Sequence, residues 1–432
     1  MSGERVVLIG AGATGALSAV RLAERGFRVT VLEKAAIGNG SSSRSNACIR
    51  AQFGVAETIT GMMYSEWAYR RFHEWLQTPP QSRQPVMEQN GYLFLYEHPD
   101  TVAPQRRAET GQAWQQALAR VELQQRLGLE VEVLSPAQVS ARWPHLDPER
   151  LIGATWCPTD GFLHPHVIYG EGFRRARELG VEVFSRTEVV GARRAGDRII
   201  AVETTRGPLE GEYFVNATNA WAPRTSERLG GMPLPIAPLK RYLYHLKVTR
   251  PIMDEDAWRR LPMTIYGMGP GRGTFSRPDG PQLILGLSHK TDSEPDFADE
   301  DQDRIMPGFS HEHGLENLGY QVLEQVAEFA PELADAGGLA ATNCGYYGMT
   351  PDANPLIGFD ALVPNLLHAA GFSGHGIMHA PVTAVLIEAL LAGDVQGGHV
   401  RLPHPFEQHR IALAAFDPAR EFRADAAETM VL

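Results

Sequence analysis

Cysteine is scarce in this sequence of 432 residues, and its three cysteines, Cys48, Cys157 and Cys344, lie far apart. They form neither the paired spacing of a zinc site nor the dense framework of a small secreted domain. Such sparse usage is typical of a reducing compartment, so we expect a cytoplasmic protein without a metal site.

The sequence also lacks an excess of positive charge and any run of about 18 apolar residues that could span a membrane. Its formal net charge is −11, which argues against nucleic acid as a partner. The N-terminus reads as a strand and a turn rather than as a secretion signal. Hydrophobic residues make up 43% and charged residues 21%, which is typical of a globular protein. This length predicts two domains or more.

Glycine is concentrated at two places, and the first is GAGATG at residues 10–15. The apolar run VVLIG predicts a buried strand before it, ALSAVRLAERG predicts an amphipathic helix after it, and FRVTVLEK predicts a second strand. Gly10 permits a tight turn, Gly12 lets the backbone approach a pyrophosphate, and Gly15 allows close helix–strand packing. Glu33 ends the second strand and is placed to accept from ribose hydroxyls. The pattern predicts a dinucleotide site but does not separate NAD from FAD.

The second cluster is GFSGHG at residues 371–376, directly before the apolar run 377–393. Glycines at such density indicate positive φ or close backbone approach, and the helix that follows would aim its N-terminus at the same place. The small polar loop IGNGSSSRSN, residues 37–46, offers hydroxyls and Arg44 to a diphosphate or a ring system. An ordinary surface loop is the alternative for that segment.

Several segments, in order along the chain, resemble the flavin-dependent D-amino-acid oxidase superfamily. The resemblance is to the branch of glycine and sarcosine oxidases and of dimethylglycine, sarcosine and proline dehydrogenases. The segments are GAGATG…LEK, GSSSRSNACIRAQFG, TDGFLHPH, EYFVNATNAWAP, YGMTPDANPLIG and GFSGHGIMHAP. The resemblance implies FAD, bound non-covalently, and an α/β fold. In that fold a Rossmann-like FAD-binding domain is interleaved with an α+β substrate domain on a mixed, largely antiparallel sheet.

The resemblance also implies domain boundaries. The FAD-binding domain takes residues 1–72, 152–232 and 336–414, the substrate domain takes 73–151 and 233–335, and 415–432 form a peripheral tail. Within them we expect helices over residues 167–180 and 111–127, and strands at GYLFLYE, RYLYHLKV and PQLILGLSH.

The residues that the resemblance assigns to the cofactor come from both glycine clusters, the polar loop and two strands. GFSGHG would stabilise negative charge at flavin N1/O2, and Val189 would meet the adenine. Asn219 stands where the family has glycine, and asparagine tolerates left-handed geometry. The assigned residues are Gly10, Gly12, Ala13, Thr14, Gly15, Glu33, Lys34, Ser42, Ser43, Arg44, Ser45, Asn46, Ala47, Val189, Ala217, Trp221, Gly371, Phe372, Ser373, Gly374, His375, Gly376 and Ile377.

The implied reaction oxidises the C–N bond of an amine or amino acid, a secondary amine or a glycine- or proline-like substrate, to an imine by hydride transfer to flavin N5. Arg50 would hold the substrate carboxylate with its bidentate fork. His375 would act as an acid–base group. Tyr347 and Tyr266 are the remaining catalytic candidates, and Phe275 competes with Tyr266 for the family's tyrosine position.

The chain departs from the family pattern at three places. Met378 stands where sarcosine-oxidising relatives have a second carboxylate-binding lysine, which weakens the case for a small amino acid. Ile284 stands where oxidases have the lysine that promotes reaction with oxygen, which favours a dehydrogenase passing electrons to a quinone or protein partner. A covalent flavin link through Cys344 is the less favoured alternative, because the family's cysteine position falls on Gly345.

Two other functions stay open from the sequence. One is an FAD-binding subunit or assembly protein with little turnover in a hetero-oligomer, since the family includes an assembly factor. The other is an NAD-dependent enzyme. A flavin spectrum that an amine bleaches would separate the main hypothesis from both.

Overall fold

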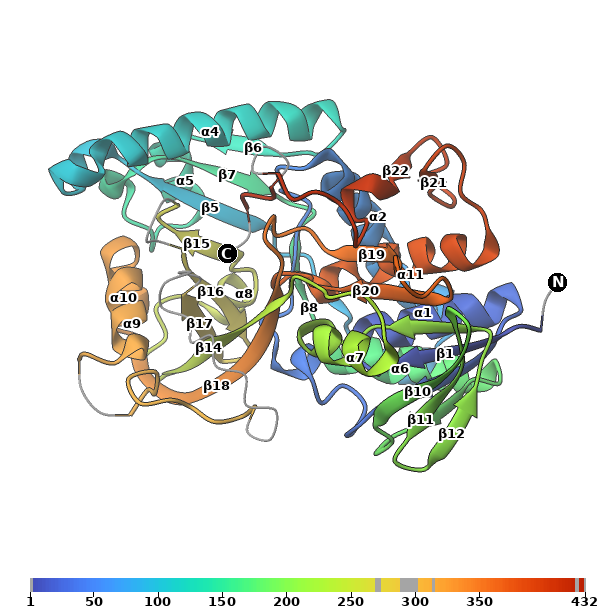
Figure 1. Ribbon diagram of the computed structural model, residues 1–432. Coiled ribbons are helices and arrows are strands. Elements are labelled where there is room, and N and C mark those ends of the chain that lie inside the picture. The colour runs from blue at the N-terminus through green and yellow to red at the C-terminus, as the bar shows by residue number, and fades with distance from the viewer. Residues whose placement is uncertain (1–2, 269–272, 288–301, 313–314, 424–426, 431–432) are drawn as a thin grey trace.

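Two large sheets, one of six strands and one of eight, organise the chain. The computed structural model describes residues 3–268, 273–287, 302–312, 315–423 and 427–430. Figure 1 shows the eight-stranded sheet beneath the long helix α4 on one side and the six-stranded sheet on the other. The predicted fold class, a Rossmann-like domain interleaved with a second domain, is confirmed.

The six-stranded sheet has the order β19-β20-β13-β1-β2-β9, and only β19 runs antiparallel to its neighbour. Both faces of β1 are covered, which is why its sequence is a continuous apolar run. Val6 and Leu8 pack with α1, whereas Val7 and Ile9 pack with the small sheet β10–β12. The strands are β1 Arg5–Ile9, β2 Arg28–Leu32, β9 Glu182–Phe184, β13 Tyr213–Asn216, β19 Leu356–Phe359, β20 Leu366–Ala370, β10 Val189–Ala195, β11 Arg198–Thr204 and β12 Gly207–Glu210.

Helix α1 packs against both α11 and α6 on one face of this sheet. The helix predicted over 167–180 is confirmed as α6, and Gly26 and Gly393 end α1 and α11 in the left-handed conformation. The helices of this half are α1 Ala13–Arg25, α2 Ala56–Arg70, α3 Phe72–Trp75, α6 Pro165–Glu178, α7 Ala222–Leu229 and α11 Gly376–Ala392.

The eight-stranded sheet has the order β18-β14-β17-β16-β15-β5-β7-β6. Its two faces belong to different cores. Phe94, Leu243 and Phe275 join the core shared with the six-stranded half, and Tyr244 and Leu285 face the opposite core with α9. The strands are β5 Tyr92–Glu97, β6 Glu132–Leu134, β7 Leu151–Cys157, β14 Ala237–Val248, β15 Met263–Tyr266, β16 Thr274–Asp279, β17 Gln282–Leu287 and β18 Gly337–Met349.

Five helices and two small sheets complete the elements that the site depends on. The helix expected near 111–127 is confirmed as α4. The helices are α4 Arg107–Arg126, α5 Pro136–Arg142, α8 Glu255–Arg259, α9 Leu318–Phe329 and α10 Pro331–Ala334. The short strands are β3 Cys48–Ile49, β4 Met87–Glu88, β8 Gly161–Leu163, β21 His399–Arg401 and β22 Arg410–Ala412.

The predicted boundaries need correction at three places. Strand β7 pairs with β5 and β6, and β18 pairs with β14 along its length, so both belong to the eight-stranded sheet. Motif order does not reveal strand pairing, and the cuts at 152 and 336 therefore separated two strands from their partners. The tail is not peripheral either, since Phe416, Glu428 and Met430 are buried.

None of the helices in the described ranges is long and apolar enough to cross a membrane. The three cysteines are buried and form no disulfide with one another.

Candidate active site

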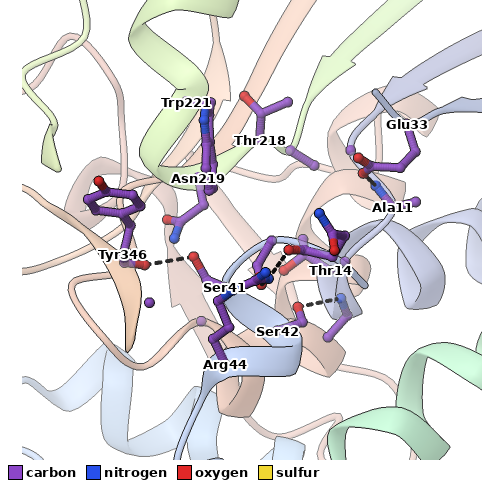
Figure 2. Close-up of a pocket in the computed structure, with 18 of the residues that line it drawn as sticks. Ala11, Thr14, Glu33, Ser41, Ser42, Arg44, Thr218, Asn219, Trp221 and Tyr346 are labelled. Carbon is purple, nitrogen blue, oxygen red and sulfur yellow. Dashed lines mark hydrogen bonds between the residues drawn. The ribbon is translucent and has the colours of Figure 1, made fainter. Parts of the chain in front are cut away.

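A pocket of about 1550 Å³, its open mouth included, lies at the carboxyl ends of the parallel strands. This edge is where open parallel sheets bind their ligands. Ile9, Leu32 and Ala217 contribute from the ends of β1, β2 and β13, and Phe372 follows β20. Strand β18 closes the other end, and Figure 2 shows Tyr346 and Glu33 at opposite ends of the pocket.

The first glycine turn is tight because no side chain would fit in it. A Cβ on Gly10 would lie 2.6 Å from the Ala217 carbonyl oxygen, and one on Gly15 would lie 2.1 Å from the Gly10 carbonyl oxygen. The Ala13 amide donates to the Ser42 hydroxyl at 3.1 Å, as Figure 2 shows. Among the described residues, no other side chain caps helix α1. Its positive N-terminal end therefore faces the pocket and suits a diphosphate.

Glu33 is fixed where β2 ends. Its carboxylate accepts the Ala11 amide at 3.0 Å and the Ala35 amide at 2.9 Å. The next residue, Lys34, places its ammonium 4.9 Å from the centre of the Trp221 ring. Glu33 and Lys34 both line the pocket, so a ligand bound at this end would contact a carboxylate and an ammonium group.

The GFSGHG turn is held by Asn219. The Asn219 side-chain oxygen accepts from the Gly371 amide at 3.1 Å and the Phe372 amide at 3.2 Å. Asn219 itself has φ +47°, so the expected left-handed geometry is confirmed. Ser373 has φ +48° and Gly374 has φ +94°. A Cβ on Gly374 would lie 2.3 Å from the Tyr347 ring, so this position requires glycine.

The side chains of His375 and Ser373 are turned away from the pocket. His375 is bound through Nε2 to the Ala353 carbonyl oxygen at 3.1 Å, and its Nδ1 lies 3.1 Å from His379 Nδ1. Burial, His379 and Arg50 lower the pKa of His375 well below its usual value. The Ser373 hydroxyl accepts the Thr350 amide at 3.2 Å. The predicted acid–base role of His375 therefore lacks a path to a ligand, because its ring is buried in the core with both nitrogens engaged.

Successive side chains along a strand point to opposite faces of the eight-stranded sheet, and this decides which of the other candidate residues face the pocket. Tyr347 and Gly345 line the pocket, whereas Cys344 lies in the opposite core, 3.2 Å from the Gln302 carbonyl oxygen. Cys344 therefore faces away from the pocket, and the alternative of a covalent flavin link through its sulfur is wrong. Tyr266 also faces the opposite core, where its hydroxyl lies 2.8 Å from Ser276 Oγ. The catalytic assignment of Tyr266 fails for the same reason, and Phe275 is on the pocket side.

Arg50 lies deep beside the pocket rather than in its wall. Its guanidinium carbon is 3.9 Å from the centre of the Phe53 ring, 5.7 Å from that of Tyr92 and 5.6 Å from that of Phe94. The guanidinium donates to the carbonyl oxygens of Gln52 and Met430. Its charge also acts on Tyr347, where burial raises the pKa and Arg241 and Arg50 lower it. Arg50 is thus close to the end of the pocket at β18.

Most of the predicted cofactor residues line this one pocket. They are Gly10, Gly12, Ala13, Thr14, Glu33, Lys34, Ser42, Arg44, Ser45, Asn46, Val189, Ala217, Trp221, Phe372, Gly374, Gly376 and Ile377. The structure places outside the lining Gly15, Ser43, Ala47, Gly371, Ser373 and His375.

The tertiary structure also brings in lining residues that the sequence motifs did not predict. Ser41, Thr218 and Arg224 lie next to predicted positions and could have been found by extending those motifs. Arg241 and Leu243 come from β14, whose inward face no motif marks. The missed residues include Ile9, Ala11, Leu32, Ala35, Asn39, Gly40, Ser41, Thr187, Glu188, Thr218, Asn219, Arg224, Thr225, Arg228, Arg241, Leu243, Gln302, Gly345 and Tyr346.

Comparison with known proteins agrees with this geometry. A model of the FAD-dependent oxidoreductase family matches residues 5–390. The FAD-dependent oxidoreductase domain-containing protein 1 of Xenopus laevis is 26% identical, over 91% of this chain and 79% of its own. Glycine oxidase of Geobacillus kaustophilus is 24% identical, over 89% and 92%. The crystal structure of L-proline dehydrogenase from P. horikoshii superposes with a TM-score of 0.77 at 27% identity and covers 96% of both chains.

The described residues fit FAD. The turn at Gly10 has no room for a Cβ. The N-cap residues of α1 and α11 supply no side-chain cap, Ser42 contacts only the first amide of α1, and both N-termini face one elongated pocket. Two such anion-binding ends suit a ligand with a diphosphate at one point and an electron-rich ring further along. The cofactor is FAD, and Gly374, Gly376 and Ile377 would meet its ring.

Gly374→Ala should weaken FAD binding by about tenfold, because the new Cβ would push Tyr347 into the ring site. Gly393→Ala is the matched control. Gly393 has φ +73°, yet the described part of the chain offers its Cβ no contact within 4 Å. Flavin released from each purified variant during dialysis, followed by fluorescence, measures the difference. Equal release from both variants would contradict a steric role of Gly374.

His379 should make the fold sensitive to acid. Burial lowers its pKa to about 4, so between pH about 6.5 and 4 the unfolded chain binds a proton that the folded chain does not. The contribution of His379 to the free energy of unfolding is therefore fully present above pH 6.5 and decreases by about 3 kcal/mol as the pH falls toward 4. Urea unfolding of His379→Gln should show a smaller loss over this range than the unsubstituted protein. The exposed His399→Gln is the control, and an unchanged slope in His379→Gln would contradict the prediction.

Proposed function

The chain belongs to the FAD-dependent oxidoreductase family, and we propose that it oxidises the C–N bond of an amino acid to an imine. The substrate is a secondary amine or a glycine- or proline-like molecule. FAD, when bound, accepts the hydride equivalent at N5. The residues of this chain bind the substrate, orient it and hold charge at defined atoms.

The buried charge of Arg50 carries this proposal. Its side chain is 3% exposed, and its hydrogen-bond acceptors are two neutral carbonyl oxygens. No ion pair within 4.0 Å joins the guanidinium to a carboxylate of the described residues, and the buried Asp160 carboxylate, which accepts the Ala51 amide, interacts with the Arg50 charge from beyond that distance. A buried cation without an anionic partner is costly, and a carboxylate in bidentate contact offsets that cost. A substrate carboxylate would supply the missing anion.

The surroundings of Arg50 favour an apolar substrate body. The rings of Phe53, Tyr92 and Phe94 surround the guanidinium, and Phe275 and Ile284 lie on the same face of the sheet. Such apolar surroundings favour a pyrrolidine ring or an alkylated amine over glycine. Met378 is buried in the same core and offers no second cation.

Helix α11 and Tyr347 support the reaction at the ring. The first backbone N–H groups of α11 have no carbonyl partner within the helix, so its positive end can hold negative charge at flavin N1/O2. Burial raises the pKa of the Tyr347 hydroxyl, which therefore stays protonated and can donate a hydrogen bond. The substrate amine would lie between this hydroxyl and Arg50.

Ile284 favours a dehydrogenase over an oxidase. It is 5% exposed and lies on the pocket side of β17, where a lysine would bring a positive charge toward the ring. A cation near the flavin stabilises the negative charge that forms when oxygen accepts an electron. With isoleucine in place of lysine at this position, a quinone or a protein partner is the proposed acceptor.

A binding or assembly subunit with little turnover is the less supported alternative. Arg50 and its aromatic surroundings are suited to a small anion and have no evident use in a scaffold. The cytoplasm stays the proposed location, on the evidence of cysteine usage alone.

Anaerobic reduction tests the proposal. Proline or an N-methyl amino acid should bleach the flavin, and Arg50→Lys should lower the second-order rate by about 100-fold, because lysine lacks the planar fork. Arg71→Lys, at a side chain that is 57% exposed, should match the unsubstituted protein. A flavin that no amine reduces would favour the binding subunit, and a normal rate in Arg50→Lys would remove Arg50 from the site.

Reoxidation of the reduced enzyme tests the acceptor. Oxygen should reoxidise the flavin slowly, and a quinone or dye should do so at least tenfold faster. Ile284→Lys should raise the oxygen rate at least tenfold, because it adds a cation on the pocket side. Ile284→Met controls for the change of shape. Rapid reaction of the unsubstituted protein with oxygen would identify an oxidase instead.

A further inference from the structure

The C-terminal segment 427–430 enters the protein beside Arg50. Glu428 is 4% exposed and Met430 is 3% exposed. The Glu428 amide donates to the Asp352 carbonyl oxygen at 2.8 Å, and the Met430 amide donates to the Glu428 carboxylate at 2.8 Å. The segment is thus folded onto the site rather than lying along the surface.

Glu428 attaches the segment to the loop that carries Arg50. Its carboxylate accepts the Gly54 amide at 3.0 Å and the Val55 amide at 3.1 Å. Val55 is the N-cap residue of α2, whose own residues provide no side-chain cap. The tail therefore supplies the anion that the N-terminus of this helix favours.

The Met430 carbonyl oxygen accepts a hydrogen bond from the Arg50 guanidinium. Arg50 donates through one terminal nitrogen to the Met430 carbonyl oxygen and through the other to the Gln52 carbonyl oxygen. Both ends of the planar fork are engaged, and one of them is engaged by the tail. A neutral carbonyl is a weaker partner for a guanidinium than a carboxylate is.

We propose that the segment 427–430 is a built-in competitor for the substrate carboxylate on Arg50. In the docked state the Met430 carbonyl takes the position of a carboxylate oxygen, and substrate enters when the segment leaves. This inference rests on the proposed function of Arg50. It assigns the segment 427–430 a regulatory role, since anything that holds the segment open raises the affinity for substrate.

The segment 427–430 can detach from the rest of the protein as one unit. Residues 427–430 belong to no helix or strand, and the bonds described above join them to Asp352, to the start of α2 and to Arg50. Short segments held in this way open at far lower cost than the whole fold. If the docked state dominates, the apparent affinity for a carboxylate is reduced by the fraction of open protein.

Carboxylate binding to the holoenzyme tests the competition. The probe is pyrrole-2-carboxylate, which cannot be dehydrogenated like proline, and its binding is followed by the change in flavin absorbance. A chain ending at residue 426 and the Glu428→Gln variant should each bind the probe more tightly, by about tenfold for the truncation. Glu421→Gln, at an exposed acid upstream, should match the unsubstituted protein.

Probe binding distinguishes a failure of the proposed competition by segment 427–430 from a failure of the proposed amine oxidation. Binding within twofold of the unsubstituted protein, or weaker, in both tail variants overturns the competition while leaving the carboxylate site intact. Probe binding that is absent from the unsubstituted and truncated proteins alike, together with a flavin that no amine reduces, overturns the proposed function itself.

Hydrogen exchange gives a readout that does not require any substrate. In Arg50→Gln the segment loses an anchor, so the Met430 amide should exchange at least tenfold faster than in the unsubstituted protein. In the unsubstituted protein, saturating probe should accelerate the same amide. Unchanged exchange in Arg50→Gln would show that Arg50 does not hold the segment, and would overturn the inference.

Discussion

The active-site end of this protein depends on the side-chain amide of Asn219. Its oxygen accepts two successive backbone amides of the second glycine turn, at 3.1 and 3.2 Å. This contact joins the chain after β13 to the chain after β20 and fixes the path by which the turn reaches α11. The left-handed residues that follow then place Gly374 against Tyr347 and direct the N-terminus of α11 into the pocket. A shift in this single contact would move both the ring site and the helix that stabilises its charge.

The two faces of the eight-stranded sheet have different roles, since one lines the pocket and the other packs against the opposite core. The inward face presents Tyr347, Leu243 and Arg241 to the pocket. The outward face buries Tyr266 and Cys344 against the other core. A change of one position along a strand reverses the face. This explains why Tyr266, one of two candidates for the family's tyrosine position, and Cys344, one residue from the family's cysteine position, are not at the ring.

The loop between β3 and α2 links three parts of the molecule. The Asp160 carboxylate accepts the Ala51 amide at 3.0 Å and the Gln52 side chain at 2.9 Å, which holds the loop from one side. Glu428 of the tail holds it from the other. Arg50 is therefore positioned by a strand, a helix start and the C-terminal segment together, and its exposure to substrate depends on all three.

The sequence by itself determined the dinucleotide turn, the acid after β2, the glycine turn before α11 and the interleaving of two domains. The two turns and the acid are local features, because spacing within a strand–turn–helix unit fixes which backbone groups face a ligand, whereas the interleaving followed from the family resemblance. The sequence also located about half of the residues in the pocket wall. Only the tertiary structure decided that His375 faces the core, that Tyr266 and Cys344 face away, that β7 and β18 belong to the larger sheet, and that the tail reaches Arg50. Side-chain direction and strand pairing depend on partners outside each motif, from Ala353 beside His375 to Met430 beside Arg50, and no local pattern encodes those partners.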